Sequence, residues 1–109
     1  NNYETKRYGN SDITIYRTSV TYDPQYNMCV TLHIANNTMK KIVAIKVGIY
    51  YSSKEQQSID REEVSKNITL NQEETEEIFL FGSPKSTYAF MMLGKITVYF
   101  SDGTKQELY

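Results

Sequence analysis

The stretch "NMCVTLHIANNTMKKIVAIKVGIYY", residues 27–51, decides the fold class. Apolar side chains alternate with other side chains at both of its ends, and the Asn-Asn-Thr between them is typical of a turn. Period-two alternation predicts two β-strands. In the first, the shared apolar face holds Met28, Val30, Leu32 and Ile34. In the second, we expect a buried face of Val43, Ile45, Val47, Ile49 and Tyr51 and a wetter face of Ile42, Ala44, Lys46, Gly48 and Tyr50.

The same pattern continues on both sides of this stretch. Residues 12–23 alternate but change phase, which predicts a β-bulge or a change of sheet near residues 17–19. Residues 67–70 and 75–81 predict two more strands, with a polar turn at 71–74. Residues 95–100 predict another, and Gly94 before it indicates a bulge. Its inward side chains are expected to be Ile96, Val98 and Phe100.

Two short segments carry local sequence patterns, one for the start of a helix and one for a turn. Asp60 followed by Glu63 is a weak capping-box pattern, so residues 60–66 are given one short helical turn. Asp102-Gly103 lies between two alternating segments, which predicts a hairpin with a two-residue type I′ turn. A calcium loop would need more oxygen ligands at short spacing, and the next acid is Glu107.

These strands predict an all-β domain. About seven short strands without long helices favour an antiparallel β-sandwich of immunoglobulin-like form, with a small barrel as the alternative. The chain has one cysteine and no tryptophan, so the disulfide and the central Trp of antibody domains are absent. We assign residues 12–109 to a single sandwich domain and residues 1–11 to an N-terminal extension or linker. Because the chain starts without Met or an apolar leader, we expect a fragment of something longer.

Charge and hydropathy narrow the possible partners. The formal net charge of the 109 residues is −1, and basic residues are scattered, which gives little support for nucleic-acid binding. No apolar run is long enough to span a membrane. Residues 54–77 carry three basic and eight acidic side chains. This acidic segment is interpreted as a solvated face, or else as a docking surface or a divalent-metal site.

Catalytic patterns are weak. The single histidine, His33, and the single cysteine, Cys29, are four residues apart on one strand. At about 3.3 Å per residue they lie about 13 Å apart, too far for a thiolate–imidazole pair. Pairs of glutamates could serve as acid and base only across a cleft, and these pairs fall in polar turns. We therefore expect no enzyme activity and no cofactor.

The ten tyrosines are the strongest recognition signal. Tyrosine suits strands, but it is also a common contact residue at interfaces, for a protein or a glycan. The segment "YAFMML", 88–93, is a candidate apolar contact patch, with core packing as the alternative. The candidate partner-binding residues are Tyr16, Tyr50, Glu73, Glu74, Tyr88, Phe90 and Met91.

Residues 28–81 resemble the FxLYD-like domains of bacterial surface proteins and lipoproteins. The resemblance is in the order of features: a strand ending in Asn, a turn, a strand ending in an aromatic pair, and a Glu-Thr turn before a Phe-containing strand. The matching residues are Asn36, Tyr50-Tyr51, Leu70, Glu74-Thr75 and Phe79. The resemblance implies an extracytoplasmic, non-enzymatic module.

The sequence therefore predicts a non-enzymatic interaction or spacer module of a larger extracytoplasmic bacterial protein. A protein is the expected partner, and oligomers could form through an edge strand. The alternatives are a carbohydrate-binding module and a metal-dependent domain that uses residues 54–77.

Overall fold

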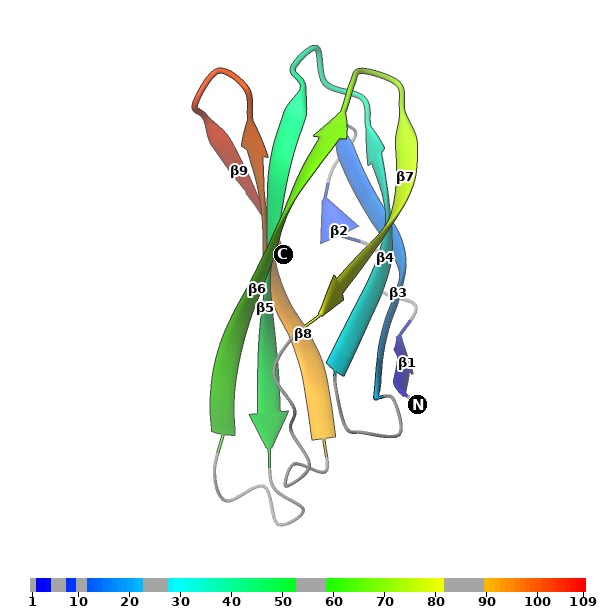
Figure 1. Ribbon diagram of the computed structural model, residues 1–109, viewed down its shortest axis with the longest axis vertical. Coiled ribbons are helices and arrows are strands. Elements are labelled where there is room, and N and C mark those ends of the chain that lie inside the picture. The colour runs from blue at the N-terminus through cyan, green and yellow to red at the C-terminus, as the bar shows by residue number, and fades with distance from the viewer. Residues whose placement is uncertain (1, 5–7, 10–11, 23–27, 53–58, 82–89) are drawn as a thin grey trace.

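Two antiparallel sheets make up the described part of this computed structural model, which covers residues 2–4, 8–9, 12–22, 28–52, 59–81 and 90–109 (Figure 1). The first sheet has the order β1-β3-β4-β7, with β2 also pairing with β3; its strands are β1 (Asn2–Glu4), β2 (Tyr8–Gly9), β3 (Ile13–Tyr22), β4 (Met28–Asn36) and β7 (Thr75–Phe81). The second sheet has the order β6-β5-β8-β9; its strands are β5 (Ile42–Ser52), β6 (Ile59–Leu70), β8 (Phe90–Phe100) and β9 (Lys105–Leu108).

The core lies between these sheets and consists of the alternating side chains. Strand β4 shows this most clearly, because every second residue from Met28 to Asn36 is buried. The expected all-β class is confirmed. The buried apolar residues are Ile13, Ile15, Met28, Val30, Leu32, Ile34, Ile42, Ile45, Val47, Ile49, Tyr51, Val64, Leu70, Ile78, Leu80, Leu93, Ile96, Val98, Phe100 and Leu108.

Two predicted irregularities are confirmed. Along β3 and β4, Tyr16 pairs with His33 and Ser19 with Thr31, so the register shifts within the expected segment 17–19. Along β5 and β8, Val47 pairs with Ile96 and Ile49 with Leu93. Two residues of β8, one of them Gly94, therefore lie opposite the single residue between Val47 and Ile49.

Two local predictions are wrong. Residues 60–66 form no helical turn; they lie inside β6, which pairs with β5 from Ser52 to Ile42. Sheet pairing along this length outweighs a weak capping pattern. At the start of β5, Ile42 is buried and Val43 only half-buried, because the register shifts between Ile42 and Ala44 and reverses the faces of the strand there.

The N-terminal residues contribute to the first sheet. Strand β1 pairs with β3 at residues 18–20, and β2 pairs with β3 at Thr14 and Ile15. Both strands fall within residues 1–11, the segment that we expected to be an extension or linker. In the described ranges there is no helix with the length and apolar character needed to cross a membrane.

Candidate binding site at one end of the sandwich

Three described connections meet at one end of the sandwich, at the top of Figure 1: those between β4 and β5, β6 and β7, and β8 and β9. Backbone hydrogen bonds join them. The amide of Asn36 donates to the carbonyl of Glu74 at 3.0 Å, and the amide of Ser101 donates to the carbonyl of Lys41 at 2.9 Å. These bonds hold the three loops against one another.

Asn36, the last residue of β4, is the buried centre of this end. Its side-chain amide donates to the carbonyl of Lys40 at 2.8 Å and to that of Leu70 at 3.0 Å. Its side-chain oxygen accepts from the backbone amide of Thr38 at 3.0 Å and from the Thr38 hydroxyl at 2.7 Å. Both donors and both acceptor positions of the amide are used, which is what a fully buried Asn requires.

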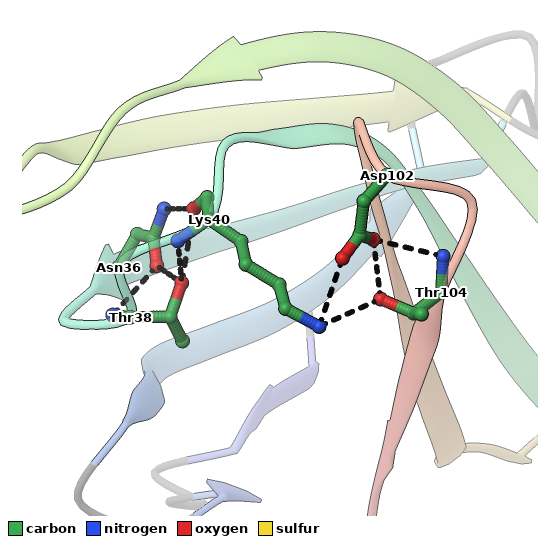
Figure 2. A network of polar contacts seen from close by, with 5 residues as sticks. All are labelled: Asn36, Thr38, Lys40, Asp102 and Thr104. Atoms are coloured by element: carbon green, nitrogen blue, oxygen red, sulfur yellow. Dashed lines mark hydrogen bonds and ion pairs between the residues drawn. The ribbon is translucent and has the colours of Figure 1, made fainter.

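Asp102 makes the same local turn on the neighbouring hairpin, as Figure 2 shows. Its Oδ1 accepts from the backbone amide of Thr104 at 3.0 Å and from the Thr104 hydroxyl at 2.5 Å. Lys40 connects the two turns (Figure 2): its Nζ lies 3.0 Å from Asp102 Oδ2 and donates to Thr104 Oγ1 at 3.0 Å. The same ammonium lies 5.3 Å from the centre of the Phe100 ring.

These contacts set the protonation of Asp102. Hydrogen bonds from the Thr104 hydroxyl and backbone amide, followed by the contact with Lys40, lower the pKa of Asp102 from 3.8 to about 2. Each of these donors stabilises the ionised carboxylate. Asp102 therefore remains charged at any pH at which a cell works, and Lys40 keeps its counter-ion.

The β8–β9 connection is a hairpin, as expected, but its turn is not type I′. The amide of Gly103 donates to the carbonyl of Phe100 at 3.1 Å, and the amide of Phe100 donates to the carbonyl of Thr104 at 2.9 Å. Gly103 has a φ of 89°, whereas Asp102 is not among the described residues with positive φ. This is a three-residue loop in which a glycine bulge follows the turn.

An open pocket of about 340 Å³ lies beside the β4–β5 loop. Its lining residues are Asp12, Asn37, Thr38, Met39, Lys40, Phe100 and Gln106. Met39 has 89% of its surface exposed, the highest fraction among the described large apolar side chains. The residues on either side of Met39 are fixed by the Asn36 network, since the Lys40 amide donates to the Thr38 hydroxyl at 3.1 Å. A rigid loop thus presents a single apolar side chain to solvent.

The predicted residues Glu73 and Glu74 belong to this end. Both are exposed in the β6–β7 turn, where Glu73 has a φ of 66°, a left-handed conformation unusual for a residue with a side chain. The Glu73 amide donates to the carbonyl of Asn36 at 2.6 Å. The Glu74 carboxylate accepts from the backbone amide of Asn71 at 2.6 Å. Glu74 therefore stabilises its own turn, and Glu73 is left as the outward-facing acid.

Tyr50 lies elsewhere, on the outer face of the second sheet. Its ring covers Gly94: a Cβ at that position would come within 2.5 Å of Tyr50 Cε2. The Arg61 guanidinium lies 5.9 Å from the ring centre and 3.1 Å from the Glu63 carboxylate. The hydrogen bond from Arg61 lowers the pKa of Glu63 more than any other contact does. Tyr50 is 37% exposed, so the ring both packs on the sheet and offers part of its surface to solvent.

Tyr16 lies on the outer face of the first sheet. Its ring stacks on His33 with 5.5 Å between centroids, and His33 Nε2 lies 2.7 Å from Glu77 Oε2 on β7. His33 and Cys29 are both half-buried and lie four residues apart on β4, the strand predicted for them. The structure thus places Tyr16 and Tyr50 on opposite sheets, far from a common site.

The predicted apolar patch falls largely beyond what can be described. Tyr88 lies outside the described residues, and for Phe90 and Met91 the description covers the backbone at the start of β8. Within the described part of the chain, no group of three or more His, Cys, Asp or Glu side chains could hold a metal ion. Residues 54–58 of the acidic segment lie outside the described residues.

Sequence reasoning missed the centre of this end, which is Asn36 with Lys40 and Asp102. The available signal was the pattern Asx-x-Thr at residues 36–38 and 102–104, which also occurs at residues 12–14 and 67–69, where strands form instead. This pattern favours turns in which the side chain accepts from the backbone two residues later. That the two turns meet through Lys40 depends on the packing of the sheets and leaves no trace in local sequence.

Comparison with known proteins gives similarity of fold alone. No protein-family model matches the sequence, and no curated protein matches it significantly. Two solved structures are similar. One is IrmA from Escherichia coli, with 16% identity and a TM-score of 0.54 over 94% of this chain and 85% of that one. The other is the putative ApaA protein from Bordetella pertussis, with 16% identity and a TM-score of 0.51 over 95% of this chain and 89% of that one.

Proposed function

We propose that this domain is a non-enzymatic interaction module that binds a protein partner through the end of the sandwich carrying Met39. The observation that carries the proposal is an 89%-exposed Met39 on a loop fixed by the buried Asn36 amide. Because the backbone of the loop is already held by hydrogen bonds, binding costs little backbone entropy there, and the main entropic cost is the rotamer freedom of the Met39 side chain. Methionine also adapts its shape to a partner surface.

The strand order supports an immunoglobulin-like topology. Strands β3, β4 and β7 form one sheet and β5, β8 and β9 the other, as strands A, B, E and C, F, G do in immunoglobulin domains. Strand β6 lies beside β5, in the place of C′. In this assignment the β4–β5 and β8–β9 loops are the B–C and F–G loops, which carry binding residues in variable domains.

The parent protein is proposed to be an extracytoplasmic bacterial protein. This rests on the resemblance to FxLYD-like modules. Among the residues that carry the resemblance, Asn36, Leu70 and Glu74 lie together at this end, joined by the hydrogen bonds of Asn36.

Affinity capture tests the proposal. The immobilised domain is exposed to extracts of its own organism, in parallel with Met39→Ser and with the control Met92→Ser, whose side chain is 58% exposed on β8. We expect a saturable protein to be captured by the wild type and the control and lost with Met39→Ser. Equal capture by the wild type and Met39→Ser would refute this site. The absence of any saturable capture would favour a spacer role.

A carbohydrate-binding role is the second candidate, favoured by the ring of Tyr50 over Gly94. A partly exposed aromatic ring beside the Arg61–Glu63 ion pair offers both stacking and hydrogen bonds. Retention of the domain on insoluble polysaccharides, abolished by Tyr50→Ser, would support it. Equal elution of the wild type and Tyr50→Ser would contradict a carbohydrate-binding role for Tyr50.

A further inference from the structure

Strand β7 is an edge strand of the first sheet and the longest regular edge that this sheet has among the described strands. Strand β1 has three residues and β9 has four, too short to template much pairing. Strand β6 is longer, but charged residues, which protect an edge, are spread over much of it: Asp60, Arg61, Glu62, Glu63 and Lys66. On β7 the charged residues are Glu76 and Glu77, and residues 78–81 are uncharged. Strand β7 has seven residues, and its pairs with β4 run from Thr75 to Phe81 without a bulge. It also lacks proline, the other common protection.

The backbone groups that β7 turns to its outer edge can be assigned. Lys66 Nζ, on β6, donates to the carbonyl of Phe79 at 3.1 Å, so this carbonyl faces away from β4. An added strand would have to displace Lys66 from this carbonyl. In antiparallel pairing the amide and carbonyl of one residue point to the same side, and the side alternates along the strand. Glu77, Phe79 and Phe81 therefore direct their amides and carbonyls to the outer edge, whereas Ile78 and Leu80 bond to β4.

The same three residues place their side chains on the outer face. Phe79 is 42% exposed and Phe81 is 69% exposed. Two exposed phenylalanines at alternate positions of an edge are what an added strand would cover. The other half of the strand is acidic: Glu76 and Glu77 are exposed, and they follow the exposed Glu73 and Glu74. The edge is thus apolar at its C-terminal half and negative at its N-terminal half.

We infer that β7 binds an extended segment of another protein by antiparallel strand addition, with apolar residues of that segment beside Phe79 and Phe81 and Lys or Arg beside Glu77. The segment would read apolar first and basic second, because antiparallel pairing reverses the order of β7. This inference rests on the proposed role in protein binding, but it uses a surface separate from Met39.

A second copy of the chain fits this edge poorly. Antiparallel pairing of two β7 strands centred on Phe79 would put Glu77 of each copy opposite Phe81 of the other. Parallel pairing in register would bring the glutamates of both copies together, and like charges at adjacent positions destabilise a sheet. A basic and apolar strand from a different protein satisfies both halves of the edge.

A designed peptide tests the inference on the whole 109-residue chain. In the probe, two valines at alternate positions precede two lysines at alternate positions, with threonine between them. The matched control peptide carries glutamate in place of lysine. Binding is followed by NMR titration and amide hydrogen exchange. We expect the lysine peptide to protect the amides of Glu77, Phe79 and Phe81 and to leave those of Ile78 and Leu80 unchanged.

Substitutions complete the test. Phe79→Thr should weaken binding of the lysine peptide about tenfold or more, and Met92→Thr, on the other sheet, should not change it. The glutamate peptide should bind the wild-type chain no more tightly than the lysine peptide binds the Phe79→Thr variant. The inference is overturned if about 1 mM lysine peptide leaves the β7 amides unprotected, or if protection appears at another edge. It is also overturned if sedimentation shows a dimer of this chain that Phe79→Thr dissociates. Capture that depends on Met39 would survive any of these results, so failure here and failure of the proposed function are distinguishable.

Discussion

The two Asx-x-Thr turns at the binding end have the same hydrogen bonds and opposite surroundings. Asn36 is fully buried, and its turn uses a neutral amide whose two donor hydrogens reach the carbonyls of Lys40 and Leu70. Asp102 is exposed, and its turn uses a carboxylate that faces the Lys40 ammonium. In both turns the side-chain oxygen accepts the hydrogen bonds that make the turn. The second polar group differs with its surroundings: an NH2 donor faces buried carbonyls in Asn36, and a carboxylate oxygen faces an ammonium in Asp102.

Asn36→Asp should have the largest effect. A buried carboxylate in place of the amide would face the carbonyls of Lys40 and Leu70 without a proton to donate. We expect a loss of about 3 kcal/mol in the free energy of unfolding at neutral pH, measured by urea denaturation. The control is Asn37→Asp, on the exposed neighbour. Equal stability of the two variants would contradict the role given to the buried amide.

The loss of stability caused by Asn36→Asp should depend on pH. Burial beside carbonyls would raise the folded-state pKa of the new carboxyl above its unfolded value of about 3.9, so the penalty should grow as the pH rises above that value. Unfolding of Asn36→Asp at pH 4 and pH 7 checks this sign. A penalty that is the same at both values would show that the loss is steric and not electrostatic.

Gly103→Val should rank second. Gly103 has a φ of 89°, and although nothing lies within 4 Å of an added Cβ, a β-branched residue is strained in this conformation. We expect a loss of about 1–2 kcal/mol and a lower melting temperature in calorimetry. Ser101→Val, in the same loop but without positive φ, is the control. A melting temperature of Gly103→Val equal to that of the control would disprove the glycine-bulge assignment.

Asp102→Asn should have a smaller effect, confined to a pH window. The pKa of Asp102 is lowered to about 2 in the folded chain from 3.8, so its charge stabilises the fold above pH 3.8 and this contribution is lost as the pH falls toward 2. We expect the difference in melting temperature between the wild type and Asp102→Asn to shrink between pH 5 and pH 2. A difference that stays constant through this range would mean that the carboxylate charge does not matter.

Lys40→Met should have the smallest effect on stability. The backbone of Lys40 would still accept from Asn36, and only the exposed contacts of Nζ with Asp102 and Thr104 would go. Exposed ion pairs contribute little and are screened by salt. We expect a small decrease in melting temperature that disappears in 1 M NaCl. A decrease as large as that of Gly103→Val would contradict this expectation, because the exposed contacts of Lys40 Nζ would then contribute strongly to stability.

Much of the fold could be predicted because it follows from side-chain alternation. The two sheets, the bulge at residues 17–19, the irregularity at Gly94 and the β8–β9 hairpin all have a local cause in the sequence. Two of the failures have tertiary causes. The register shift near Ile42 reverses which residue is buried, and pairing with β5 turns residues 60–66 into strand.

The candidate site could be predicted only in part. Glu73 and Glu74 lie at the binding end, but the prediction rested on their charge and not on the turn that Glu74 stabilises. Met39 was missed because a single apolar residue in a polar loop gives no pattern. The exposure of Phe79 and Phe81 also could not be read from alternation, since a strand with apolar residues on both faces does not reveal which face is covered.

The Asn36 network also has a consequence for chemical ageing. Asparagine deamidates when the backbone nitrogen of the next residue attacks its side-chain carbonyl and forms a succinimide. Here that nitrogen, in Asn37, donates to the carbonyl of Asp12 at 2.7 Å, and the Asn36 amide is itself held by two carbonyls. We expect Asn36 to deamidate only from the unfolded chain. Because the succinimide opens to aspartate or isoaspartate, each such event would place a carboxylate at a position that the fold buries, and the modified molecule would refold less stably.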